Sequence, residues 1–174
     1  MSDETTEALF RRWIAEFGGV LLKVARAYTL AAEDREDLLQ EILLQLWRSV
    51  PRFQDRCSAC TWIYRVALNT ALGWHRKEGR RRARQEPLLE PETLPLEGPD
   101  AAAQLGQCEL VERLYEAIRQ LPKPDAAVVL LYLEDLSYRE MAEVLGISQS
   151  HLGVKLNRAK KALAEQMKEV VYES

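Results

Sequence analysis

Apolar residues recur at helical spacing through the first half of the chain, and long helices account for this pattern up to about residue 84. The single proline in this stretch, Pro51, marks a point where a helix must end. Nothing in it alternates between apolar and polar residues as a half-buried strand does. The pattern therefore predicts a helical domain over residues 5–84.

A change of composition interrupts this pattern. The segment QEPLLEPETLPLEGPDA, which starts at Gln85, holds most of the prolines of the chain, carries only acidic charges and has no helical period. Segments of this kind are typical of flexible linkers. We therefore expect a flexible acidic linker over 85–106, with a domain boundary on either side of it.

Helical spacing returns after the linker and predicts four helices, over residues 108–120, 125–134, 138–145 and 149–168. Together they form a second domain, 107–170. Each domain exceeds the roughly 50 residues that a domain needs to fold alone. The expected fold class is all-α, with two small helical domains joined by a linker.

The last two predicted helices carry the signals of a helix-turn-helix. Ser137 and Glu140 have the spacing of a capping box, in which each side chain accepts a hydrogen bond from a free backbone N–H. Gly146 stands where a left-handed residue would end the helix, and Ser148 can cap the next one. A turn of this kind indicates DNA binding, because a simple helical hairpin does not require it.

The second helix of this motif has one apolar and one polar side. Leu152, Leu156 and Leu163 form the apolar stripe. The opposite side is polar and basic, as a helix in the major groove requires. Its candidate DNA-binding residues are Ser150, His151, Lys155, Asn157 and Arg158. A helical hairpin with a solvated basic face is the alternative explanation.

Two further polar rows lie in the N-terminal part. One face of the helix around 37–48 carries Asp37, Gln40, Glu41, Leu44 and Arg48. On the helix over 61–76, one side carries Trp62, Arg65, Asn69 and Arg76, and more cations follow at Lys77, Arg80 and Arg81. Such cations neutralise phosphates without reading sequence. A solvated face and a basic tail are the alternatives.

These motifs occur in an order that matches a known family. The stretch DREDLLQEILLQLWR, then Phe53, then TWIYRVALNTALGWHRKEGRRR resemble region 2 of the extracytoplasmic-function (ECF, group 4) sigma factors, members of the sigma-70 family of bacterial RNA polymerase. The stretch LPKPDAAVVLLYLEDLSYREMAEVLGIS resembles their region 4. The resemblance covers nearly all of the chain outside the linker. It implies a sigma factor that directs core polymerase to promoters and starts the melting of the −10 element.

The resemblance also implies a role for each set of residues. The polar row over 37–48 would dock on the clamp of the core enzyme. Phe53 and Asn69 would capture a base flipped out of the −10 element, at a cost of a few kcal/mol that an aromatic wall and an amide can offset. Trp62 either joins that nucleic-acid face or packs against the loop. The helix-turn-helix would bind the −35 element, and the linker would enter the RNA channel of the polymerase.

The implied partners are the β and β′ subunits of core polymerase, promoter DNA and an anti-sigma factor, which in this family is often membrane-bound. The recognition helix departs from the family pattern, however. His151-Leu-Gly-Val-Lys155 stands where members commonly have a Thr-Val-Lys/Arg-Ser-Arg type of sequence. Gly153 costs about 1 kcal/mol of helix propensity and presents no side chain to a base. The usual −35 contacts therefore cannot be carried over to positions 153 and 154.

Composition narrows the remaining classes. No apolar run approaches the ~20 residues that span a bilayer, and the acidic start MSDETTEALF is unlike a signal peptide, so we expect a cytoplasmic protein. Three cysteines, an odd number, fit a reducing compartment. Cys57 and Cys60 have the spacing of half a zinc or redox site. Because a closed zinc site needs four ligands, we expect no metal.

No catalytic set can be assembled from the sequence. The only histidines are His75 and His151, and there is neither a nucleophile motif nor a phosphate-binding glycine loop. We therefore expect no enzymatic activity and no cofactor. The alternative function is a helix-turn-helix transcription regulator without a polymerase role, which would need a sensor domain. A mimic that sequesters sigma partners is a third class, but it would not need a basic and aromatic face.

Overall fold

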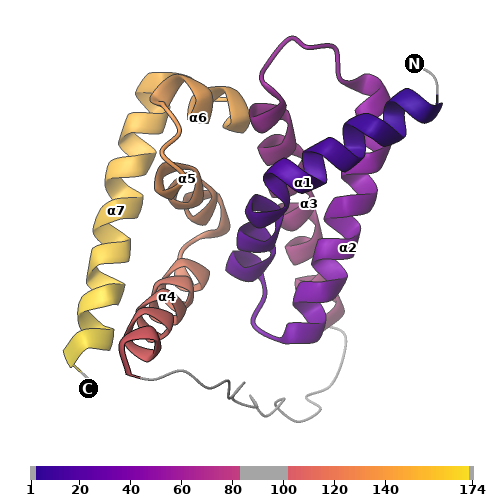
Figure 1. Ribbon diagram of the computed structural model, residues 1–174. Helices are drawn as coiled ribbons and strands as arrows, with labels where there is room; N and C mark the ends of the chain where they lie inside the picture. Colours follow the sequence, from indigo (N-terminus) through magenta and orange to yellow (C-terminus); the bar gives the residue numbers. More distant parts are fainter. Residues whose placement is uncertain (1–2, 83–101, 173–174) are drawn as a thin grey trace.

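A computed structural model describes residues 3–82 and 102–172 of the chain. Within these ranges the backbone forms seven α-helices, one short 3-10 helix and no strand, which confirms the predicted all-α fold. Figure 1 shows the helices in two groups side by side, the N-terminal helices on the right and the C-terminal helices on the left. We call residues 3–82 the N-terminal unit and residues 102–172 the C-terminal unit.

The N-terminal unit consists of α1 (Asp3–Tyr28), α2 (Ala32–Ser49), the 3-10 helix η1 (Val50–Arg52) and α3 (Ala59–Arg82). Pro51 lies in η1 directly after α2, where its missing N–H and fixed φ end the α-helix as predicted. The three long helices pack pairwise against one another. Their shared core includes Trp13, Leu21, Leu38, Ile42, Leu46 and Ile63.

The C-terminal unit consists of α4 (Ala102–Gln120), α5 (Lys123–Leu133), α6 (Tyr138–Leu145) and α7 (Gln149–Tyr172). Because α4 begins at Ala102, residues 102–106, which were expected to be linker, are helical. The rest of the expected linker lies outside the described residues. Residues 83 and 84, the last two of the first predicted domain, lie outside them as well. The predicted bounds of α6 are confirmed.

The central helix of the C-terminal unit is α5. Seven successive residues, Asp125 to Leu131, are buried. A helix that is apolar on all sides needs neighbours on all sides, and α5 contacts α4, α6 and α7 as well as α1 and α3. The one acidic side chain in this buried run, Asp125, must therefore find a partner inside the fold.

The predicted turn of the helix-turn-helix is confirmed at each end. The Ser137 hydroxyl accepts from the Glu140 N–H at 3.3 Å, and a Glu140 carboxylate oxygen accepts from the Ser137 N–H at 2.9 Å. Gly146 has φ 65°, in the left-handed region where a side chain would be strained. The Ser148 hydroxyl then accepts from the His151 N–H at 3.2 Å and caps α7. These contacts fix the angle at which α7 leaves α6.

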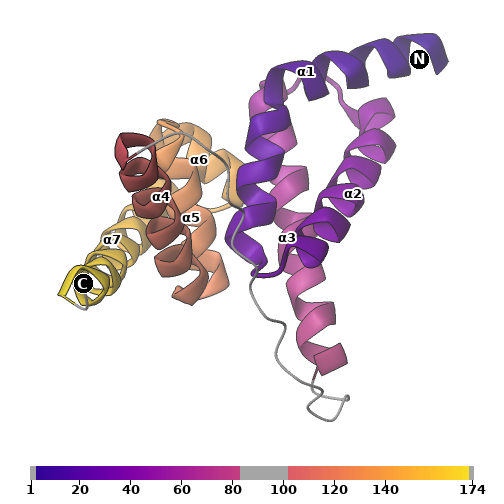
Figure 2. The same cartoon turned by 60° about the horizontal axis from the view of Figure 1, so that its bottom comes forward.

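The two units touch along α1 and α3. In the C-terminal unit, α4 and α5 lie against α1, and α6 lies against α3. Figure 2 shows the same arrangement from a second direction, with the C-terminal unit beside α1 and the far side of α7 left open. Among the described helices, none combines the length and the apolar character needed to cross a membrane.

Candidate nucleic-acid and partner interfaces

A groove between α2 and α3 brings together residues that the sequence assigned to two different roles. Asp37, Gln40, Glu41 and Leu44 form its α2 side, and Asn69 and Lys77 lie on its α3 side. Gln45, Thr70, Gly73 and Trp74 complete the lining. Of the five candidates for core binding, only Arg48 is outside this lining, although it is also exposed. We call this feature the α2/α3 groove.

Charges of opposite sign face each other across the α2/α3 groove. Asp37 and Glu41 lie on α2, while Lys77 lies on α3. Glu41 is half-buried, and its carboxylate accepts a hydrogen bond of 2.8 Å from the Gln45 amide. Asn69 is exposed, so both the donor and the acceptor of its amide are available. The groove can therefore receive a polar partner whose surface facing α2 is mainly positive.

The two candidate aromatic residues turn toward the core. The Phe53 ring meets Trp13 edge-on with centroids 5.1 Å apart and lies 5.8 Å from the Trp62 ring. The Trp62 indole N–H donates to the Ser49 hydroxyl at 3.0 Å, and that hydroxyl is buried. Both rings remain partly exposed. Trp62 thus packs against Phe53 in the segment after α2, while part of its ring stays accessible to a partner.

Arg65 connects the two units. Its guanidinium donates to the backbone carbonyl of Glu143, on α6, at 2.6 Å. In this arrangement the side chain lies between α3 and α6, and one of its guanidinium nitrogens is engaged. The sequence placed Arg65 on an outward face of α3 but gave no sign that α6 would cover it.

The C-terminal end of α3 is basic. Arg76, Lys77 and Arg80 are exposed, and the Arg80 Nε donates to the Arg76 carbonyl at 3.2 Å. Arg81 belongs to the last turn of α3, and its side chain lies outside the described part of the chain. The exposed cations give this end of the helix a positive surface that suits a phosphate backbone.

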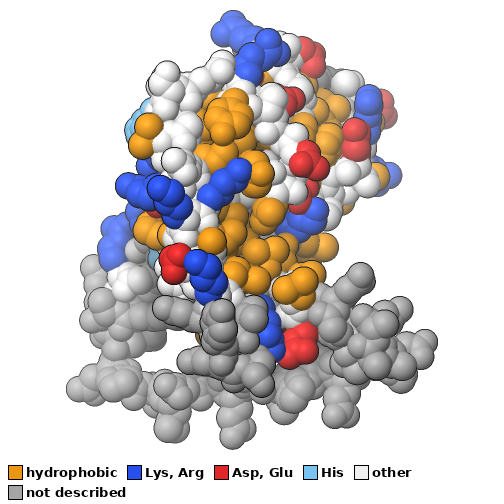
Figure 3. All heavy atoms as spheres, turned by 90° about the vertical axis from the view of Figure 1, so that its left-hand side faces the viewer, with side chains coloured by type: hydrophobic (Ala, Val, Ile, Leu, Met, Phe, Trp, Pro, Cys, Tyr) orange, Lys and Arg blue, Asp and Glu red, His pale blue; other side chains and the backbone are white. Residues whose placement is uncertain are grey.

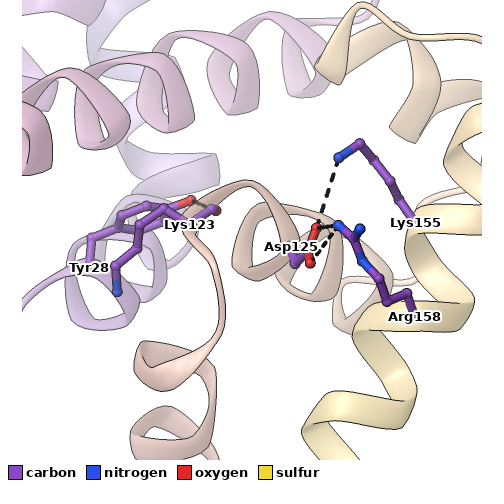
Figure 4. Close-up of polar contacts among 5 residues, drawn as sticks. All are labelled: Tyr28, Lys123, Asp125, Lys155 and Arg158. Atoms are coloured by element: carbon purple, nitrogen blue, oxygen red, sulfur yellow. Dashed lines mark hydrogen bonds and ion pairs between the residues drawn. The ribbon is translucent and has the colours of Figure 1, made fainter.

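The candidate residues of α7 divide into two sets. Ser150, His151 and Asn157 are exposed on its outward side. Arg158 instead makes two hydrogen bonds of 2.9 Å to the two carboxylate oxygens of Asp125, and the Lys155 ammonium lies 3.9 Å from the same carboxylate (Figure 4). The Asp125 side chain is only 5 % exposed, whereas that of Arg158 is 65 % exposed. The two cations therefore hold α7 against α5.

Sequence reasoning missed Asp125. The signal was present, because a carboxylate in the apolar run DAAVVLL can be buried only if a cation pairs with it.

Sequence reasoning also missed the polar contacts between the units. Arg26 pairs with Glu112, and the Arg119 guanidinium donates to the Arg26 carbonyl at 3.3 Å.

A buried tyrosine makes a further contact between the units. The Tyr28 hydroxyl, on α1, donates to the Lys123 carbonyl at the start of α5 at 2.9 Å (Figure 4). Burial raises the pKa of Tyr28 well above its ordinary value, so the phenol stays protonated and remains a donor. Lys23 and Glu134 form an ion pair close by, between α1 and the end of α5. None of these partners is close in sequence.

Cys57 lies just before α3 and Cys60 in its first turn, and both are free, partly buried thiols. Burial is the main cause that raises the pKa of each thiol. A raised pKa disfavours the thiolate, the form that binds metals and reacts. Within the described residues, no group of three potential metal ligands is present.

Comparison with known proteins gives the same division into two parts. Residues 13–81 match the family model for Sigma-70 region 2, and residues 111–163 match the model for Sigma-70, region 4. The ECF RNA polymerase sigma factor SigX of Bacillus subtilis is 31% identical over 137 residues, which cover 76% of this chain and 70% of SigX. The ECF RNA polymerase sigma-E factor of Haemophilus influenzae is 27% identical over 158 residues, 83% of this chain and 82% of that protein.

Solved structures support the fold. The sigma factor RpoE of Bartonella quintana, in complex with the anti-sigma factor NepR, has a TM-score of 0.71 at 18% identity, with 91% of this chain and 96% of that chain covered. CnrH, in complex with the cytosolic domain of CnrY, has a TM-score of 0.66 at 20% identity, with 94% and 90% covered. At these identities the likeness shows the shared arrangement of helices.

Proposed function

Because this chain belongs to the extracytoplasmic-function sigma factors of bacterial RNA polymerase, we propose that its two units divide the recognition of polymerase and promoter. Sigma factors are transcription initiation factors that direct core polymerase to promoters. In the proposal, residues 5–84 bind core polymerase and the −10 element, and residues 107–170 bind the −35 element. The match to region 2 disfavours a helix-turn-helix regulator that lacks a polymerase role.

The α2/α3 groove is the observation that carries the first half of this proposal. Asp37, Gln40, Glu41 and Leu44 present acidic and apolar surface along one side of it. Acidic side chains favour a basic partner surface and reject a like-charged one. We assign these four residues, with Arg48 at the exposed end of α2, to contact with core polymerase.

The α3 side of the N-terminal unit is assigned to the −10 element. Asn69 can hydrogen-bond the edge of a base that has left the duplex, and the partly exposed rings of Phe53 and Trp62 can support such a base by stacking. The exposed cations at the end of α3 would neutralise phosphates, with Arg81 alongside them. Arg65 can join this surface through the guanidinium N–H groups that take no part in its hydrogen bond to Glu143.

The outward side of α7 is assigned to the −35 element. Ser150, His151 and Asn157 are placed to reach base edges if α7 enters the major groove. Lys155 and Arg158 share the single negative charge of Asp125, so this cluster retains one net positive charge. A phosphate can therefore still be attracted to it, although the two cations are already oriented.

An anti-sigma factor is the further partner that we propose. Two structural relatives, RpoE and CnrH, were solved in complex with other proteins, and the partner of RpoE is an anti-sigma factor. The units of this chain meet along α1 and α3, and a partner could bind across both. The linker is proposed to pass near the active centre of the polymerase.

Asn69→Ala tests the assignment to the −10 element. The full-length variant should fold and bind core polymerase like the wild type, because Asn69 is exposed. It should form fewer open complexes on duplex promoters and lose its preference at one −10 position. A template that is already melted should restore part of the activity, because unpairing no longer costs a few kcal/mol, but should not restore the base preference.

Permanganate footprinting and run-off transcription on promoters varied at each −10 position give the readout. Asn157→Ala is the matched control, because it removes the same amide from α7 and should leave the −10 preference unchanged. Wild-type opening and wild-type preference in Asn69→Ala would overturn the base-capture role. The family membership of the chain would be unaffected.

A further inference from the structure

Val154 lies in the middle of the outward side of α7. It is 71% exposed, the largest exposed fraction among the strongly exposed large apolar side chains. On the same helix Leu152, Leu156 and Ala159 are buried, and helical spacing puts Val154 on the opposite side from them. The exposed positions around it that share its face are Ser150, His151, Asn157, Arg158 and Lys161.

Two neighbouring side chains that could compete with Val154 for this position are drawn aside, and a third is absent. Residue 153 is a glycine, so it presents no side chain, and its backbone is close to α6: a Cβ there would lie 3.9 Å from the Tyr138 ring. Arg158 and Lys155 are both directed toward the Asp125 carboxylate. Val154 therefore presents a pair of methyl groups on the outward side of α7, beside the exposed hydroxyl of Ser150 and the exposed amide of Asn157.

The surroundings favour a nucleic acid as the partner of this apolar point. Figure 3 looks onto the side of the molecule formed by α7, and hydrophobic side chains lie there between lysines and arginines. Lone valines are common on protein surfaces. This one lies on the second helix of the helix-turn-helix, within a basic surface, and this is the helix that a base edge would approach most closely in a major groove.

The chemistry of the major groove identifies the ligand. Each base pair presents hydrogen-bond donors and acceptors there, and thymine alone adds a methyl group. A valine cannot form a hydrogen bond, so the group on a base edge that it contacts favourably is that methyl. We propose that Val154 determines promoter specificity by packing against the 5-methyl group of one thymine in the −35 element. Ser150 and Asn157 hydrogen-bond the neighbouring base edges.

This inference rests on the proposed binding of the −35 element by α7, and its test can separate the two. Holoenzyme made from the full-length chain and core polymerase is used to select duplexes from a pool that is randomised over the −35 segment. In a selected duplex, each thymine is then replaced by deoxyuridine, which differs only by the missing methyl. Binding is measured for the wild type and for Val154→Ala.

For the wild type, one of these replacements should weaken binding about two- to fourfold, the effect expected when one methyl group is no longer buried. The same replacement should have no effect on Val154→Ala. Ser150→Ala is the matched control: it should weaken binding but keep the full difference between thymine and uracil. Because Val154 is exposed, its truncation leaves the core of the domain intact, and circular dichroism checks this.

Three results would overturn the inference. One is an equal loss on replacement of thymine in the wild type and in Val154→Ala, and another is a selected −35 segment without thymine. In both cases binding by α7 stands and the specificity role of Val154 fails. If the wild-type holoenzyme selects no −35 sequence at all, the proposed −35 function itself fails, and the inference with it.

Discussion

The two units differ in what becomes of their outward polar faces. In the N-terminal unit, four residues of the predicted row on α2 line the α2/α3 groove together, next to Asn69 from α3. In the C-terminal unit, the predicted row on α7 is divided. Ser150, His151 and Asn157 stay exposed, while Arg158 and Lys155 turn toward Asp125 on α5.

The difference arises from the neighbouring helix in each case. Beside α2, the facing part of α3 offers Thr70 and Gly73, which leave the groove open. Beside α7, the apolar α5 holds a buried carboxylate that requires positive charge. Helical spacing tells which side of a helix faces outward. Whether a side chain on that side is available to a partner depends on residues that are distant in sequence.

Reversal of charge in the α2/α3 groove should have the largest effect. Asp37→Arg combined with Glu41→Arg places two positive charges where a basic partner surface is proposed to dock. Juxtaposed like charges cost several kcal/mol, so affinity for core polymerase should fall more than about 100-fold. Titration of core polymerase with the labelled full-length chain measures this affinity.

The control for this change is Glu4→Arg combined with Glu36→Arg. It alters the net charge equally at exposed positions outside the lining of the groove, and should weaken binding much less. Equal losses in the two double variants would mean that total charge, and not the groove, attracts the polymerase. The contrast between an open groove in one unit and a paired cluster in the other would then lose its functional meaning.

Removal of the larger cation from the Asp125 cluster should have the next largest effect. Arg158→Met leaves a buried carboxylate with only Lys155, 3.9 Å away, as its counter-charge. Breaking a fully buried pair in this way costs roughly 3–5 kcal/mol of unfolding free energy, and the exposure of the Arg158 side chain makes the expected loss smaller. Lys155→Met should cost less, because the two short hydrogen bonds from Arg158 remain.

Hydrogen exchange of peptides from α5 and α7 measures this loss in the full-length chain. All four tryptophans lie in the N-terminal unit, at positions 13, 47, 62 and 74, so their fluorescence reports separately on that unit. It should change little in either variant. If Arg158→Met leaves exchange in α5 unaltered, the pair does not hold α7 in place and Arg158 is free for DNA.

Ser137→Ala should have the smallest effect, because it removes a cap at the surface. Loss of an N-cap hydroxyl costs about 1 kcal/mol. Hydrogen bonds from the Ser137 hydroxyl and N–H lower the pKa of Glu140 below its ordinary value. Because the pKa is lowered in the folded state, the contribution of the Glu140–Ser137 hydrogen bonds to stability is complete above the pKa of the unfolded state, about 4.3. This contribution is lost as the pH falls through the pKa of the folded state.

The stability difference between the wild type and Ser137→Ala should therefore be full near neutral pH and shrink in acid. Urea denaturation of both proteins, followed by circular dichroism over a range of pH, measures it. Glu143→Ala, on the same helix but outside the capping box, should show no such pH dependence. A difference that is constant with pH would mean that the Glu140 carboxylate takes no part in the cap.

The parts that could be predicted from the sequence are those whose cause lies within a few residues. Ser137 with Glu140, the left-handed Gly146 and the end of α2 at Pro51 are local, and all were confirmed. Trp62 with Ser49, Arg65 with Glu143 and Arg158 with Asp125 join residues 13, 78 and 33 positions apart. Such pairs depend on how helices pack, so helical spacing alone could not predict them.

The ion pairs between the two units have a consequence for how the molecule opens. Lys23 with Glu134 and Arg26 with Glu112 each include an exposed partner, and pairs of this kind contribute only about 0–1 kcal/mol. Two separate proteins held by these ion pairs alone would hardly associate. Within one chain, a tether can supply an effective concentration in the millimolar range. At that concentration, an intrinsic affinity of about 1 mM, or ~4 kcal/mol, is enough to keep the units together half of the time. A partner that binds the units apart must therefore overcome chiefly the helix packing and the Tyr28 and Arg65 hydrogen bonds between the units, because the ion pairs add little.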